Sequence, residues 1–217
     1  MNIRSDSSGN NNHKTGSNCI APVTLVGNQV TLEPLSMAHV SSLQNAATDG
    51  ELWQLWFTSV PSPDQTVSYV QTALMMAEQQ AALPFVVRDK QSNTVIGSTR
   101  FCNVDQKNRR LEIGYTWYAK RFQRTAINTE AKSLLLTHAF EQLKVIAVEF
   151  RTHWHNQASR AAIARLGAKQ DGVLRNHQQT AEGVYRDTVV FSIIESEWPA
   201  VKQNLLYKLA QSRNIVG

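Results

Sequence analysis

The segment from Leu111 to Ala131 reads LEIGYTWYAKRFQRTAINTEA, and a change of periodicity inside it decides the fold. The first half alternates apolar side chains with polar or small ones, which predicts a β-strand. From Ala126 onward the apolar residues recur at helical spacing to about residue 143, which predicts a helix. A short loop rich in Lys and Arg joins the two. The segment therefore predicts the strand–loop–helix unit of an α/β protein.

The loop in this unit is suited to an anionic ligand. Residues 100 to 125 contain seven basic side chains and only two acidic ones, Asp105 and Glu112. Free backbone N–H groups and the helix dipole at a helix N-terminus favour phosphate. The positive charge suits a phosphorylated ligand or a nucleic acid, and a solvated loop without ligand is the alternative.

Outward from this unit, the patterns predict one α/β domain with a mixed sheet and helices on both faces. Ser62 is expected to cap a helix, with Pro63 at its first position and Gln65 closing a capping box. Asn156 is expected to cap another helix, which Gly167 ends. Strands are expected near residues 30–33, 84–89, 94–102, 111–118, 146–153, 169–177 and 184–194, and helices near 36–48, 62–82, 126–143 and 157–166.

Composition limits the kind of protein. The chain has 217 residues and is 42% hydrophobic, which suits one substantial domain. The first nineteen residues include five Asn, four Ser and two Gly, so we expect a flexible tail over 1–21 and a folded domain over 22–217. No apolar run approaches the roughly 20 residues of a membrane span, and no secretory signal is evident. Cys19 and Cys102 cannot form a disulfide framework, so a cytoplasmic protein with reduced thiols is expected.

The loop also carries a family resemblance. Gln123 to Asn128 is similar to the Q/R-x-x-G-x-G/A loop of the GNAT acyltransferases, with Ala126 and Asn128 at the small-residue positions. The E-I-G-Y sequence at 112–115 and the T-E-A sequence at 129–131 resemble the RimJ/RimL-like branch of that family. The resemblance covers about residues 23 to 200.

The resemblance implies a single GNAT-type domain, with a mostly antiparallel mixed sheet, flanking helices and a splayed central strand pair. It implies an N-acetyltransferase that moves an acetyl group from acetyl-CoA to a primary amine by direct attack in a ternary complex. The amine belongs to a protein N-terminus or a small molecule. The residues implied in acetyl-CoA binding are Trp117, Tyr118, Gln123, Arg124, Thr125, Ala126, Ile127, Asn128, Thr129, Asn156 and Ser159.

Proton transfer in such a reaction has three candidate residues. The resemblance puts Ser159 near the thioester sulfur, while Ile163 stands where many members carry a Tyr acid and Gln178 where some carry a carboxylate. Glu112, through water, and His177, as an imidazole, are the candidate proton acceptors. The alternatives are that Glu112 pairs with Arg100 or Arg110 and that His177 is a surface residue.

For the acceptor, the resemblance points to Trp53 and Trp56, with core packing as the alternative, and we include Arg100 as substrate-binding. No metal is expected, because His153 and His155 have no further ligands at zinc spacing. No membrane partner is expected, and a homodimer stays open. A non-catalytic acetyl-CoA-binding module explains the vacant Tyr and carboxylate positions equally well. A nucleic-acid-binding domain explains the basic segment but lacks interleaved aromatic residues, so no nucleic acid is expected.

Overall fold

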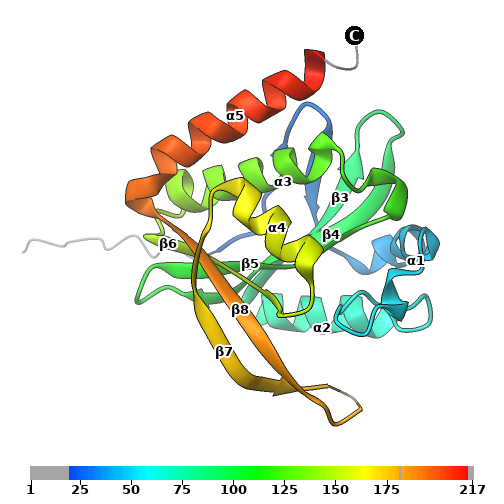
Figure 1. Cartoon of the computed structure of the whole chain (residues 1–217). Helices are drawn as coiled ribbons and strands as arrows, with labels where there is room; N and C mark the ends of the chain where they lie inside the picture. The colour runs from blue at the N-terminus through cyan, green and yellow to red at the C-terminus, as the bar shows by residue number, and fades with distance from the viewer. Residues whose placement is uncertain (1–19, 181, 215–217) are drawn as a thin grey trace, which may run out of the picture.

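The computed structural model describes residues 20–180 and 182–214 (Figure 1). Eight strands form one sheet in the order β1-β2-β3-β4-β5-β6-β8-β7. Every neighbouring pair is antiparallel except β5 with β6, which is parallel. The strands are β1 (Leu25–Val26), β2 (Val30–Pro34), β3 (Ala82–Asp89), β4 (Thr94–Asp105), β5 (Arg110–Tyr118), β6 (Ala147–His153), β7 (Lys169–Gln179) and β8 (Tyr185–Ile194). The mixed, mostly antiparallel sheet is confirmed.

Helices cover both faces of this sheet (Figure 1). The larger core lies under α3, α4 and α5, and the smaller one under α1 and α2. β3 is buried on both faces, with Phe85 and Val87 in the larger core and Val86 in the smaller one. Each such side chain contributes about 1.5–3 kcal/mol by leaving water. The helices are α1 (Val40–Thr48), α2 (Thr66–Glu78), α3 (Ala126–Thr137), α4 (Gln157–Leu166) and α5 (Trp198–Asn214).

The parallel pair of strands diverges after three residues. Arg110–Glu112 of β5 pairs with Ala147–Glu149 of β6, and no pairing continues toward the carboxyl ends. Each strand is followed by the N-terminus of a helix, α3 after β5 and α4 after β6. The divergence leaves backbone groups of the two strands without ladder partners there. The predicted splayed central pair is confirmed.

A β-bulge interrupts β5 at the same level. Gly114 and Trp117 both keep their register with β4, but Tyr115 and Thr116 between them face only Thr99. Tyr115 takes a left-handed φ of 51°, which a non-glycine residue adopts only where its surroundings hold it. The bulge turns the Tyr115 side chain toward the α2 face of the sheet.

A buried carboxylate fixes α3 against the start of the sheet. Glu130 accepts hydrogen bonds from the backbone N–H groups of Asn28, Gln29 and Val30, at 2.9, 2.7 and 2.9 Å. These donors would otherwise have no partner in the turn between β1 and β2, so Glu130 stabilises the position of the helix on the sheet.

Several predicted boundaries are wrong. α2 begins at Thr66 with Gln65 as its N-cap, because Ser62 and Pro63 instead form a preceding turn in which the Ser62 carbonyl accepts from Gln65 N–H at 3.0 Å. The helix after the basic loop changes at Thr137 into a π-helical stretch, His138–Gln142. β1 and α5 are absent from the predicted order.

The ends of the chain bear on the predicted domain limits. Ile20 is buried in the larger core, so the packed region includes part of the predicted 1–21 tail. Residues 1–19 lie outside the described residues. Among the helices of the described ranges, none is long and apolar enough to cross a membrane.

Candidate active site

The basic loop after β5 presents backbone donors and positive charge together. Thr125 caps α3, since its hydroxyl accepts from Ile127 N–H at 3.3 Å and donates to the Phe122 carbonyl at 2.7 Å. Arg124 takes a left-handed φ of 60°, which turns the backbone before the first helical turn. The side chains of Lys120, Arg121 and Arg124 are exposed. This arrangement is chemically suited to a diphosphate group.

The remaining loop residues hold the loop to the sheet or to the helix. The Gln123 side chain donates to the Tyr118 carbonyl at 3.0 Å, which closes the loop onto the end of β5. Ile127 is buried in the larger core. Thr129 is buried too, and its hydroxyl accepts from Arg165 of α4 at 3.1 Å. Thus Gln123, Ile127 and Thr129 position the backbone.

Trp117 and Tyr118 lie in the two different cores. The Trp117 indole is buried with the α1 and α2 residues and the Tyr118 phenol with those of α3. Within the described part of the chain, neither the indole N–H nor the phenol OH has a hydrogen-bond partner. Both side chains therefore pack into the fold, on opposite faces of the sheet.

The start of α4 confirms Asn156 as an N-cap. Its Oδ1 accepts from the Ser159 backbone N–H at 3.0 Å, and Gly167 ends the helix with a φ of 106°. Ser159 is half-buried in the first turn. Ile163, at the vacant tyrosine position, is buried in the larger core. The two helix N-termini that follow β5 and β6 thus supply the loop and the Asn156–Ser159 pair.

Glu112 lies in a polar row across β5 and β6, at the last paired position before the strands diverge. Asn103 donates to its carboxylate at 2.8 Å, and Arg151 Nε lies 3.5 Å away. Burial raises the pKa of Glu112. The partner is therefore Arg151, not Arg100 or Arg110; the latter pairs with Glu149 at 2.5 Å.

His177 occupies a different setting. It is exposed on β7, with Nδ1 3.1 Å from the Thr188 hydroxyl. Within the described ranges, no hydrogen bond or ion pair joins it to Glu112 or Ser159. The structure therefore does not bring the three catalytic candidates into one contact set.

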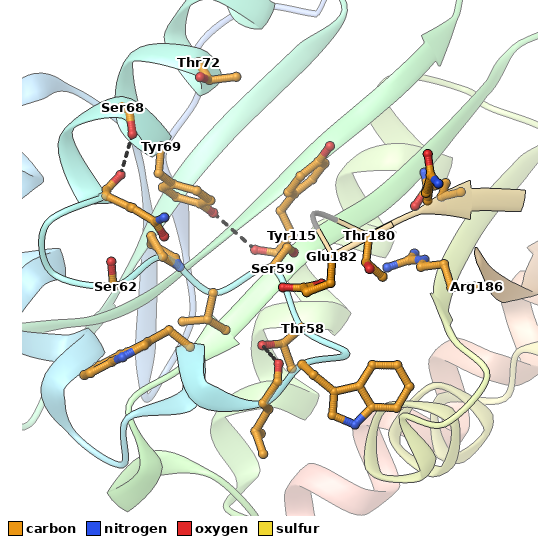
Figure 2. Close-up of a pocket in the computed structure, with 18 of the residues that line it drawn as sticks. Thr58, Ser59, Ser62, Ser68, Tyr69, Thr72, Tyr115, Thr180, Glu182 and Arg186 are labelled. Atoms are coloured by element: carbon orange, nitrogen blue, oxygen red, sulfur yellow. Dashed lines mark hydrogen bonds between the residues drawn. The ribbon is translucent and has the colours of Figure 1, made fainter. Parts of the chain in front are cut away.

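An open cavity of about 800 Å³ lies on the α2 face of the sheet. Trp53, Trp56 and Arg100 all line it. Tyr115 and Arg186 line it too (Figure 2). Trp56 is 59% exposed, with its ring centroid 4.8 Å from that of His153. The alternative of core packing therefore does not hold for Trp56. The other walls come from the segment between α1 and α2, from α2 itself and from the tip of the β7–β8 hairpin.

Sequence reasoning missed a buried lysine beneath the bulge. Lys132 Nζ donates to the Thr116 hydroxyl at 2.5 Å and to that of Thr99 at 3.4 Å. Burial lowers the pKa of Lys132 to about 7. Its position between Thr129 and Leu135 on the buried side of α3 was a usable signal.

Comparisons with known proteins agree with this geometry. The profile of the acetyltransferase (GNAT) domain matches residues 29–169. The chain is 36% identical over 109 residues to the Bacillus subtilis protein named "Putative ribosomal N-acetyltransferase YdaF", an alignment that spans 50% of this chain and 58% of that one. It is 24% identical to the uncharacterized N-acetyltransferase p20 of Bacillus licheniformis, over 81% of this chain and 98% of the other.

Solved structures give the same result. A GCN5-related N-acetyltransferase from Brucella melitensis superposes with a TM-score of 0.78 at 29% identity, covering 88% of this chain and 87% of the other. The profile match spans the diverging strands, the basic loop and the start of α4. Members of the matched family are acyltransferases that use acetyl-CoA as the acetyl donor. The chain belongs to the GNAT family of acetyltransferases.

Proposed function

We propose that this protein transfers the acetyl group of acetyl-CoA directly to a primary amine in a ternary complex. The observation that carries the proposal is the divergence of β5 and β6 into two helix N-termini, one preceded by the basic loop. A thioester arm lying between the strands would hydrogen-bond backbone groups near Trp117 and Tyr118, as an added strand does. A backbone N–H there would stabilise the oxyanion by a few kcal/mol.

Different residues would bind the diphosphate and the pantetheine arm of acetyl-CoA. The backbone of Arg124, Thr125, Ala126 and Asn128 would bind the diphosphate, supported by the exposed basic side chains of the loop. Asn156 would donate its side-chain amide to the pantetheine arm while its oxygen caps α4. These roles use donors that the local fold leaves available.

Proton transfer is proposed for groups at two sites. An ammonium must lose a proton before it attacks, and Glu112, acting through water, is the candidate acceptor. Its raised pKa brings it nearer to neutral pH than an ordinary Glu. The Ser159 hydroxyl would hydrogen-bond the departing thiolate. His177 stays the alternative acceptor, because it borders the Gln178–Gln179 wall of the cavity.

The acceptor class is a primary amine, either a protein N-terminus or a small molecule. The curated relative named for ribosomal N-acetylation favours a protein N-terminus. The competing proposal is a module that binds acetyl-CoA without turnover, and it draws on Ile163 and Gln178 at positions where other members carry proton donors or acceptors.

The test has a binding part and a turnover part. Acetyl-CoA at millimolar concentration should raise the melting temperature by mass action, more than ATP at equal ionic strength does. CoA release should then accelerate on addition of a panel of peptide N-termini, amino acids and polyamines. A melting shift without CoA release from any amine would support the non-catalytic module. Absence of a melting shift in a folded sample would contradict both proposals.

A further inference from the structure

Arg100 on β4 is a buried cation without a counter-ion. Its exposed fraction is 1%, and its guanidinium carbon lies 4.0 and 4.9 Å from the ring centroids of Tyr115 and Tyr69. Nη1 lies 3.7 Å from the Met76 sulfur, while Nε and Nη2 have no hydrogen-bond partner in residues 20–180 and 182–214. Among the described residues, no carboxylate forms an ion pair with Arg100. A buried unpaired guanidinium is strongly unfavourable unless a ligand supplies an opposite charge and hydrogen-bond acceptors.

The edge of the Arg100 guanidinium that has no partner is formed by Nε and Nη2, and this is an edge with which arginine binds carboxylates. Elsewhere in the same chain, Arg88 holds Glu33 through its Nε and Nη2, at 2.7 and 3.0 Å. Two parallel N–H donors on one edge match the two oxygens of a carboxylate. Arg100 leaves the same two nitrogens without a hydrogen-bond partner among the described residues, and its guanidinium carbon lies over the rings of Tyr115 and Tyr69.

Neighbouring titratable groups do not neutralise Arg100. Burial raises the pKa of the Cys102 thiol to about 12 and also raises the pKa of the Tyr115 phenol, so both stay uncharged near neutral pH. The carboxylate of Glu112 is held by Asn103 and Arg151. Among residues 20–180 and 182–214, therefore, no group supplies a negative charge to Arg100.

Arg100 also lies beside a place where an acceptor can bind. It lines the open cavity together with Tyr115 and Arg186, whose Nε is likewise unpartnered. Tyr115, Arg186 and Glu182 all line this cavity (Figure 2), and Glu182, from the β7–β8 turn, carries the opposing charge. Two guanidinium groups against one exposed carboxylate favour an anionic ligand.

We propose that the acceptor amine carries a carboxylate, which Arg100 binds through Nε and Nη2 with Arg186 as the second cation. This inference rests on the proposed function, since it assumes that the acceptor uses this cavity. Tyr115, which is 43% exposed and sits on the bulge, must turn aside to uncover the edge. The carboxylate belongs either to a free amino acid or to an acidic residue next to a peptide N-terminus.

The experiment uses matched acceptors and one variant. Free amino acids are compared with their α-amides, and the peptide Ser-Glu-Ala-amide with Ser-Gln-Ala-amide. Wild-type protein should prefer the carboxylate member of at least one kind of pair by tenfold or more in kcat/KM. In Arg100→Met that preference should fall at least tenfold, because kcat/KM should drop more for the carboxylate member of each pair than for its amide. The first pair reports a free amino acid, and the second reports an acidic peptide.

Folding and binding are checked separately. Arg100→Met removes an unpaired buried charge beside Met76 and should not lower the melting temperature, and Lys107→Gln, an exposed change in the β4–β5 turn, controls for net charge. Melting shifts with N-acetylalanine against N-acetylalaninamide, and with N-acetyl-Ser-Glu-amide against its Gln counterpart, report anion binding without turnover. The carboxylate ligands could raise the melting temperature of wild type and not of Arg100→Met while no amine is acetylated. That result would support the anion site and contradict the proposed function. If amines are acetylated without a preference for the carboxylate member, the carboxylate inference is wrong while the proposed function stands. The same conclusion follows if Arg100→Met shows the same preference as wild type.

Discussion

The Asn156 Oδ1 atom accepts a hydrogen bond from the backbone N–H of Ser159 at 3.0 Å, so this side chain caps α4. Only the oxygen of the amide is used. Among the described residues, no hydrogen bond engages the Asn156 Nδ2 group. One side chain can therefore stabilise the helix and still donate to a ligand lying between β5 and β6.

Because Oδ1 caps the helix and Nδ2 is available to a ligand, Asn156→Ser should separate the two roles. Serine caps a helix about as well as asparagine, so the free energy of unfolding should change by only a few tenths of a kcal/mol. The amide donor is lost, so acetyl-CoA affinity or turnover should fall several-fold. Urea unfolding and acetyl-CoA titration on the same preparation check both parts. Unchanged affinity and turnover would leave Asn156 with its capping role alone.

Ser159→Ala should lower kcat by about tenfold to thirtyfold. The expected loss corresponds to one hydrogen bond to the forming thiolate, worth one to two kcal/mol. The matched control is Ile163→Val, four residues further along α4, which should cost about 0.5–1.5 kcal/mol of stability and leave kcat nearly unchanged. A wild-type kcat in Ser159→Ala would remove the serine from the proposed mechanism.

Local signals predicted much of the fold. The alternation along β5 predicted that strand, and Asn156 and Gly167 predicted the limits of α4. The prediction at Ser62 was wrong because capping preferences do not distinguish a helix start from a turn that directly precedes the helix, here Ser62 to Gln65. α5 went unpredicted; its polar residues surround a narrow apolar stripe, formed by Trp198, Val201, Leu205 and Leu209.

The site was less accessible to sequence reasoning. Arg151 comes from β6, so its contact with Glu112 depends on the parallel pairing of strands far apart in sequence. Likewise, the bulge that places Tyr115 over Arg100 depends on register with β4. Such relationships arise from tertiary pairing and leave no periodic signal. The basic loop was recognisable because its charges and helix start are contiguous.

Glu112→Gln should lower turnover and change the acid limb of the pH–kcat profile. The carboxylate is active when ionised, so activity is lost as pH falls through its pKa, which burial holds above the usual Glu range. In Glu112→Gln that limb should disappear from the profile. The profile of kcat at saturating acceptor, from pH 5 to 9, measures this.

The neighbouring Glu149 provides a directional control. Its negative charge raises the pKa of Glu112, and its carboxylate pairs with Arg110 and Arg151. Glu149→Gln should therefore keep the acid limb and move it to lower pH. If Glu112→Gln retains the wild-type limb, His177 or bulk water becomes the better proton acceptor.

Lys132 predicts that stability depends on pH in an unusual direction. Burial lowers its pKa to about 7, whereas an unfolded chain has a lysine pKa of about 10.4. Between these values the unfolded state binds more protons than the folded state, so the free energy of unfolding rises with pH. From pH 7 to 9 this lysine should contribute an increase of about 2 kcal/mol.

Lys132→Met should abolish that increase and be the more stable protein at pH 7, because Thr99 and Thr116 still hydrogen-bond each other at 2.7 Å. Urea unfolding at pH 7, 8 and 9 measures it, with Lys107→Met, an exposed lysine, as the control that should follow the wild-type curve. Parallel curves for wild type and Lys132→Met would mean that Lys132 stays protonated in the fold throughout this range.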